Sequence, residues 1–138
     1  MNTNVEAGDK LVRVELLEIQ CTSPGSNGGD SLQIYGSLDV MTSTAVNFWK
    51  RNANNAVDIP FNRPHHVGNF QVFTVKPGQV LNIFGHLWEK DTISDDDMGT
   101  SQENIRYDQI SPATKTVFLR FNQLGQKVQA IFIVNENV

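Results

Sequence analysis

Apolar and polar residues alternate one by one along much of this chain, and this period of two constrains its fold more than any other feature. The clearest alternating segment runs from Ser31 to Val40. Its apolar positions are Leu32, Ile34, Leu38 and Val40. Because successive side chains of a strand point to opposite faces of a sheet, this segment is predicted to be a strand with one buried face.

A second alternating segment, Lys10 to Cys21, changes phase at Leu16 and Leu17. One extra residue in a strand shifts the phase in this way, so we expect a β-bulge at that point. Six further segments carry a shorter or less regular strand pattern. The eight predicted strands are Lys10–Cys21, Ser31–Val40, Val46–Lys50, Ala56–Ile59, Phe70–Val75, Gln79–Glu89, Thr114–Phe121 and Lys127–Asn135.

No stretch keeps an apolar period of 3.6 over ten or more residues, so the sequence predicts at most one short helix, between Thr100 and Gln109. Many short strands with one buried face most often form a two-sheet sandwich or a closed barrel. We therefore expect an all-β fold, a single antiparallel β-sandwich of about eight strands. It is expected to span residues 1–138 as one domain, with residues 1–9 as a flexible N-terminal segment.

Composition and local motifs exclude several classes of function. The chain has 138 residues and a formal net charge of −4, which disfavours nonspecific nucleic-acid binding through clustered Lys and Arg. Its single cysteine, Cys21, permits no internal disulfide. There is no GxSxG elbow and no phosphate-binding glycine loop, so we expect no catalysis. Without a signal peptide or a membrane-spanning run, we expect a soluble protein, either cytoplasmic or the mature form of a secreted one.

Acidic residues gather directly after the predicted strand that ends at Glu89. The segment Glu89 to Gly99 contains Glu89, Asp91, Asp95, Asp96 and Asp97 within nine consecutive residues. Crowded carboxylates repel one another unless a cation, a proton or a basic side chain offsets their charge, and calcium prefers carboxylate oxygens. Aspartate is also common in solvated turns for backbone reasons. The segment thus indicates either a calcium loop or a solvated acidic turn.

With strands on both sides, this acidic segment resembles the third calcium-binding loop of C2 domains. In that family two acids separated by one residue follow an aromatic strand end, and a third acid precedes a glycine. Glu89, Asp91 and either Asp96 or Asp97 occupy these places. The segment Ser26 to Asp30, which opens a strand, is similar to the first loop of the family. The family's other first-loop aspartate falls here on Pro24, and the resemblance therefore implies a single site of modest affinity.

The resemblance implies a C2-like module that binds calcium and docks on an anionic surface, most plausibly membrane phospholipid. The implied metal ligands are Asp30, Glu89, Asp91, Asp95, Asp96 and Asp97. Ile93 lies at the predicted loop tip, where the family inserts a side chain into the membrane, although it could also anchor the loop from below. Met98 is expected to pack inward. Lys50 and Arg51 together with Arg63 could form a small basic patch for phosphoinositides, although three such charges are more often an ordinary solvated surface.

Two other classes of function remain open from the sequence. In the first, Trp49 is an exposed platform for a sugar ring instead of a core aromatic like the other strand aromatics, and the chain is a calcium-assisted carbohydrate-binding module. In the second, the chain is a structural or protein-partner module in which calcium only stiffens the loop or is not used. His65 and His66 are expected in a turn after Pro64 with solvated rings, and His86 as a packed, hydrogen-bonded side chain.

Overall fold

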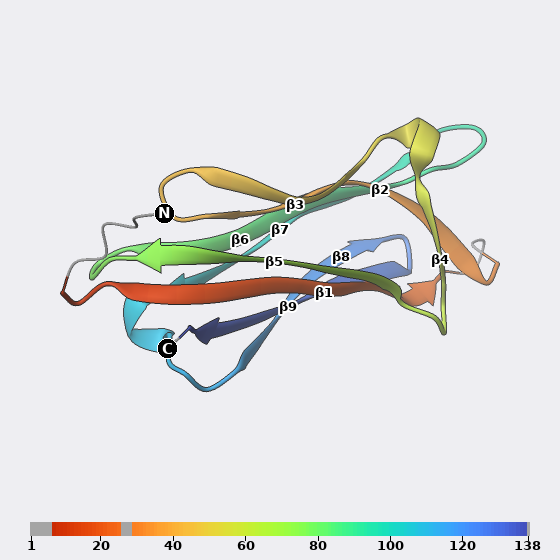
Figure 1. Cartoon of the computed structure of the whole chain (residues 1–138). Coiled ribbons are helices and arrows are strands. Elements are labelled where there is room, and N and C mark those ends of the chain that lie inside the picture. The colour runs from red at the N-terminus through yellow and green to blue at the C-terminus, as the bar shows by residue number, and fades with distance from the viewer. Residues whose placement is uncertain (1–6, 26–28, 138) are drawn as a thin grey trace.

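The computed structural model describes residues 7–25 and 29–137, which form nine strands arranged in two layers (Figure 1). The strands are β1 (Lys10–Pro24), β2 (Ser31–Met41), β3 (Ala45–Arg51), β4 (Val57–Pro60), β5 (His65–Val75), β6 (Val80–Glu89), β7 (Asp96–Arg106), β8 (Lys115–Gln123) and β9 (Gln126–Glu136). Two short 3-10 helices, η1 (Ala53–Asn55) and η2 (Tyr107–Gln109), lie between them. Within residues 7–25 and 29–137, no helix has the length and apolar character needed to cross a membrane.

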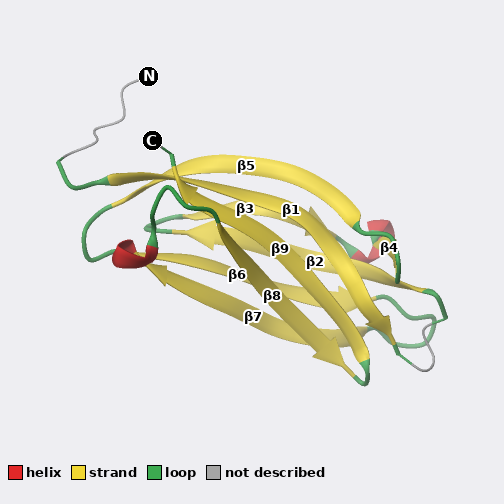
Figure 2. Ribbon diagram, turned by 90° about the horizontal axis from the view of Figure 1, so that it is seen from below, coloured by secondary structure: helices red, strands yellow, loops and turns green. Residues whose placement is uncertain are grey.

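The strands form two antiparallel sheets that face each other (Figures 1 and 2). One sheet has four strands in the order β5-β1-β9-β8, and the other has five, in the order β3-β2-β6-β7 with β4 also paired to β2. The all-β, antiparallel sandwich expected from the sequence is therefore confirmed. The structure adds one strand to the expected eight, which is β7.

Alternation along each strand supplies the core between the sheets. On β6, Leu81, Ile83 and Leu87 are fully buried, and they face residues of the other sheet such as Leu16 and Phe132. Burying each such side chain contributes roughly 1.5–3 kcal/mol relative to leaving it in water. The β-bulge expected in β1 is also present, because the register with both neighbouring strands shifts between Leu16 and Glu18.

The prediction of a short helix between Thr100 and Gln109 is wrong for most of these residues. Residues 96–106 form β7, which pairs with β6 from Val80↔Arg106 to Glu89↔Asp96. Only residues 107–109 turn as a 3-10 helix. Strand β7 lies at the edge of its sheet and buries only Met98 and Ile105 in the core, so its sequence carries little strand periodicity.

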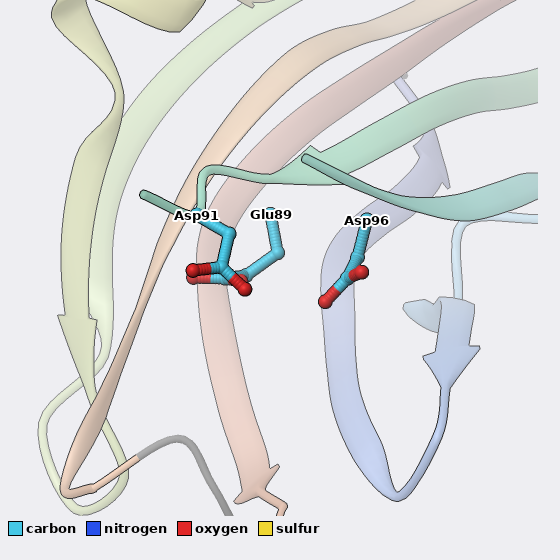
Figure 3. Close-up of side chains that lie close together, drawn as sticks. All are labelled: Glu89, Asp91 and Asp96. Atoms are coloured by element: carbon cyan, nitrogen blue, oxygen red, sulfur yellow. The ribbon is translucent and has the colours of Figure 1, made fainter. Parts of the chain in front are cut away.

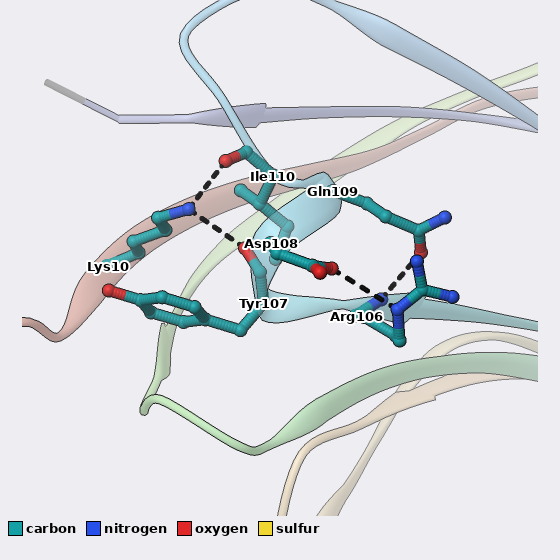
Figure 4. Close-up of polar contacts among 6 residues, drawn as sticks. All are labelled: Lys10, Arg106, Tyr107, Asp108, Gln109 and Ile110. Atoms are coloured by element: carbon teal, nitrogen blue, oxygen red, sulfur yellow. Dashed lines mark hydrogen bonds and ion pairs between the residues drawn. The ribbon is translucent and has the colours of Figure 1, made fainter.

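A set of polar contacts holds the end of β7 and η2 against β1 (Figure 4). Lys10 Nζ donates hydrogen bonds of 2.8 Å to the carbonyl oxygens of both Tyr107 and Ile110, and its ammonium lies 4.2 Å from the centre of the Tyr107 ring. Arg106 Nε lies 3.2 Å from a carboxylate oxygen of Asp108. These contacts fix the connection between the two sheets at the end of the sandwich that carries η2.

Candidate metal site

Glu89 is a carboxylate at the end of a row of buried apolar side chains. The alternation of β6 turns Leu81, Ile83, Leu87 and Glu89 towards the other sheet, and Glu89 is only 9% exposed. Its Oε2 atom accepts a hydrogen bond of 3.4 Å from the backbone N–H of Gln33 on β2. The strand pattern therefore places a charged group where the sandwich interior opens at one end.

Three carboxylates converge at this end of the sandwich. Glu89, Asp91 and Asp96 each offer an oxygen, and these oxygens lie within 4.8 Å of one another. Glu89 and Asp96 are paired across β6 and β7, and Asp91 belongs to the loop that joins these strands. Figure 3 shows the three side chains directed towards a common space. Within the part of the chain that the structure describes, this is the one group of three or more such ligands.

The electrostatics of the site suit a bound cation. Burial raises the pKa of the Glu89 carboxyl, and the charges of Asp91 and Asp96 raise it further, whereas hydrogen bonds from Gln33 and Gln126 lower it. The Oε1 atom of Gln126 is buried and has no hydrogen-bond partner. Carboxylates that repel one another, one of them buried, and a neighbouring amide oxygen without a donor are the hard oxygen ligands that calcium prefers.

Asp95 and Asp97 belong to the same acidic segment but are not in this cluster, and each is hydrogen-bonded to other residues. Asp95 accepts a hydrogen bond of 2.5 Å from the Tyr35 hydroxyl and one of 3.1 Å from the Asp91 N–H. Asp97 lies 2.6 Å from His86 Nε2 and accepts a bond of 2.8 Å from the Gly99 N–H. These partners lower the pKa of both carboxyls, and burial together with Asp95 raises the pKa of Tyr35 to about 12. Both aspartates thus shape the loop from outside the cluster.

Asp30 is not one of the three carboxylates whose oxygens lie within 4.8 Å of one another. It precedes β2 by one residue, and Ile34 is the β2 residue that pairs with Glu89. Its carbonyl oxygen accepts a hydrogen bond of 2.8 Å from the Phe61 N–H. Residues 26–28 of the expected first loop lie outside the described residues.

The expected contact residues lie in different environments. Ile93 is 95% exposed at the tip of the loop between β6 and β7. Lys50 is exposed and Arg51 is half-buried on β3. Trp49 is only 5% exposed, so the expectation of an exposed aromatic platform is wrong. Met98 is 3% exposed, which confirms that it packs inward.

Trp49 is buried because β3 contains a bulge that the sequence pattern did not reveal. The register between β2 and β3 shifts between Leu38 and Asp39, which pair with Trp49 and Asn47. Phe48 is the extra residue, and both Phe48 and Trp49 are buried in the core. A bulge permits two consecutive side chains to face the same side of a sheet, so simple alternation misplaces one of them.

Two features near the site were missed from the sequence. Gln126 contacts Glu89 from the start of β9, and residues so distant in the chain give no local signal of their proximity. On the outer face of the five-stranded sheet, Tyr35, Trp88 and His86 form a stack, with ring centres 6.2 Å and 5.0 Å apart. Beside this stack lies an open groove of about 580 Å³. His86 lines the groove, but the three clustered carboxylates do not.

Comparison with known proteins shows the class of fold. No family model and no curated protein sequence matches the chain. Among solved structures, human GIVD cytosolic phospholipase A2 in complex with methyl gamma-linolenyl fluorophosphonate is similar, with a TM-score of 0.53 and 8% identity over 93% of this chain. The calcium-bound structure of two C2 domains of extended-synaptotagmin 2 is similar with a TM-score of 0.51 and 15% identity over 92% of this chain.

The chain therefore has the fold of a C2 domain. It spans 17% of the phospholipase chain and 45% of the extended-synaptotagmin chain. The likeness to these structures concerns the arrangement of strands, because the identities are far too low to carry over individual residues. The C2-like sandwich inferred from the acidic segment is thus confirmed as a fold.

Proposed function

We propose that this protein is a C2-like module that binds one calcium ion through Glu89, Asp91 and Asp96 and then docks on an anionic phospholipid surface. The observation that carries the proposal is the convergence of three carboxylate oxygens within 4.8 Å, one of them from a buried side chain. The fold supports it, since extended-synaptotagmin 2, which shares the fold, has been solved with calcium bound. No catalytic step is part of this proposal.

Calcium would act at this end of the sandwich by changing the local charge. Without a cation, three carboxylates repel anionic head groups. One calcium ion offsets two of these charges and leaves this end of the sandwich far less repulsive to an anionic surface. Calcium accepts six to eight oxygens, so three carboxylates and the Gln126 amide oxygen leave positions for water or for phosphate oxygens of a lipid.

The loop between β6 and β7 also offers an apolar contact. Ile93 lies two residues from Asp91 and is 95% exposed, so the fold gains almost nothing from its apolar surface. Burial of such a side chain among acyl chains contributes roughly 1.5–3 kcal/mol. We propose that Ile93 contacts the membrane directly. Lys50 and Arg51, which are adjacent on β3, would make a weaker contact from the side. Trp49 is buried and is therefore not proposed as a contact.

Calorimetric titration of calcium into chelator-treated protein tests the metal site. We expect saturable binding of one ion, lost in both Asp91→Asn and Asp96→Asn, because each variant removes one charged ligand. Asp108→Asn is the matched control, since Asp108 is an exposed carboxylate on η2, at the other end of the sandwich. Equal heats in all four proteins, or none in the wild type, would contradict the site and leave a protein-partner module as the leading function.

Sedimentation with phosphatidylserine-containing vesicles tests the surface. Wild-type protein should sediment in calcium and not in chelator, and Ile93→Asn should sediment about tenfold more weakly with unchanged heats of calcium binding. Binding of calcium without any sedimentation would retain the metal site and reject the lipid partner.

A further inference from the structure

The β8–β9 hairpin ends in a turn whose backbone conformation does not suit its residue. Gln123 pairs with Gln126, which leaves Leu124 and Gly125 as a two-residue turn. Their φ angles are 49° and 83°, the two positive values of a type I′ turn, for which Asn-Gly is the preferred sequence. Among the residues that the structure describes, Leu124 is the one non-glycine residue with a positive φ.

Nothing within the fold offsets the strain at Leu124. A leucine in the left-handed region costs conformational free energy, because its Cβ approaches the following carbonyl oxygen. A buried leucine could regain that free energy by packing, but Leu124 is 83% exposed. The position therefore combines a strained backbone with a large apolar side chain in solvent, and backbone strain of this kind clusters at functional sites.

The hairpin lies at the same end of the sandwich as the three carboxylates. Gln126, two residues after Leu124, donates a hydrogen bond to the Glu89 carboxylate. Figures 1 and 2 show the β8–β9 turn and the loop between β6 and β7 at one end of the molecule. Ile93 and Leu124 have the highest exposed fractions of all large apolar side chains in the described residues, and Phe61, 55% exposed, follows β4 at this end.

We propose that the β8–β9 turn is a second membrane anchor, in which Leu124 enters the lipid surface together with Ile93. This inference rests on the proposed function, because calcium at the carboxylates would bring this end of the molecule to the bilayer. Ile93 and Leu124 occupy the tips of separate loops rather than one continuous patch. Separate protruding apolar tips suit a deformable lipid surface, in which each tip can be buried without a preformed pocket.

The substitution Leu124→Asn separates a structural role from a lipid contact. Asparagine favours the turn conformation, so this variant should melt at a higher temperature than the wild type. Its heats of calcium binding should be unchanged, because Leu124 contributes no ligand. It should nevertheless sediment about tenfold more weakly with phosphatidylserine–phosphatidylcholine vesicles in calcium. A variant that is more stable and yet binds vesicles more weakly has lost a contact and not its fold.

Two controls complete the experiment. Leu17→Asn removes an exposed leucine from the β1 bulge, away from the loops, and should leave vesicle binding unchanged. A polarity-sensitive dye on Leu124→Cys should shift to the blue when vesicles are added, and it will label this position because Cys21 is buried. Wild-type binding to vesicles with no loss in Leu124→Asn and no dye shift would overturn the second anchor alone. Failure of the wild type to bind vesicles in calcium would overturn the proposed function and this inference together.

Discussion

Glu89 continues the inward row of β6 after Leu87, at a position where a strand of this kind normally carries another aliphatic side chain. A buried carboxylate without a counter-charge reduces stability, and two neighbouring acids increase that cost. The cost is retained at the one place where Asp91 and Asp96 also converge. At the scale of the residue, the site is therefore a position where the fold gives up stability that a cation could restore.

The variant Glu89→Gln should separate the destabilising effect of the buried charge from its role in binding a cation. The neutral amide keeps the shape of the side chain and removes the buried charge, so the variant should unfold at a higher urea concentration than the wild type in chelator at neutral pH. Its calcium affinity should fall by at least about tenfold, because a charged ligand is lost. Urea unfolding with and without calcium measures both quantities. A variant less stable than the wild type in chelator would show that the carboxylate stabilises the metal-free fold.

His65 is expected to make the stability of the fold depend on pH, independently of the acidic cluster. The turn expected at His65 and His66 is wrong, because both residues begin strand β5. The His65 ring is half-buried and lies edge-on to Trp49 at 6.3 Å, and burial first, then the charges of Arg51 and His66, lower the pKa of the imidazole. The folded state thus favours neutral His65, and this contribution to stability is present above the unfolded pKa of about 6.5 and is lost as the pH falls through the lower folded pKa.

Acid should consequently destabilise the wild type more than His65→Gln between about pH 7.5 and 5.5, as measured by urea midpoints. His66→Gln is the matched control, because His66 is an exposed neighbour that points to the other face of β5. The control should keep most of the wild-type dependence. Identical pH profiles for the wild type and His65→Gln would contradict this assignment.

The sequence was sufficient to predict the acidic residues of the site, but it did not predict which residues from other strands surround them. Glu89, Asp91 and Asp96 are near in the chain, and β6 periodicity alone turns Glu89 inward. Which of Asp95, Asp96 and Asp97 joins the cluster depends on hydrogen bonds to Tyr35 and His86 from other parts of the sheet. The distances of Asp30 and Gln126 from Glu89 depend on strand register, which no local pattern gives, so Asp30 was named a ligand from the resemblance alone and Gln126 was missed.

At the scale of the element, the β6–β7 hairpin is the unit that makes the site. It pairs Glu89 with Asp96 and carries the loop of Asp91, and a register shift between His86 and Trp88 interrupts its ladder just before the acids. The sequence missed β7 because the pairing with β6 stabilises this edge strand, whereas its own apolar residues, such as Met98 and Ile105, are few. Tertiary pairing overrides local propensity in such strands.

Close packing of β2 on β6 depends on Gly36. Its φ is 128°, and a Cβ there would lie 2.1 Å from the carbonyl oxygen of His86. Gly36→Ala should therefore destabilise the protein by about 2–3 kcal/mol in urea unfolding, because the backbone of β6 must move. Gly68→Ala is the control: φ is 77° but nothing lies within 4 Å of the added atom, so the cost should be about 1 kcal/mol. Equal costs would show that backbone strain alone explains the requirement for Gly36.

At the scale of the whole molecule, alternation predicts a sandwich but not the order of its strands. The four-stranded sheet joins β1 to β9, which are the first and last strands, and no local pattern indicates this pairing. The same long-range pairing makes the fold cooperative, because neither sheet can form from one continuous stretch of chain. A ligand bound at one end should consequently stabilise the entire sandwich.

Hydrogen exchange tests this cooperativity. Amides that exchange only through global unfolding, expected in the central strands β1 and β9, report the full free energy of unfolding wherever they lie. At free calcium about a hundred times the dissociation constant, binding adds about 2.7 kcal/mol, so these amides should exchange roughly a hundredfold more slowly than in chelator. Residues Val14 and Val134, which pair across β1 and β9, are suitable probes. Asp91→Asn should show no calcium effect, and slowing restricted to the loop between β6 and β7 would mean that calcium orders this loop without stabilising the sandwich.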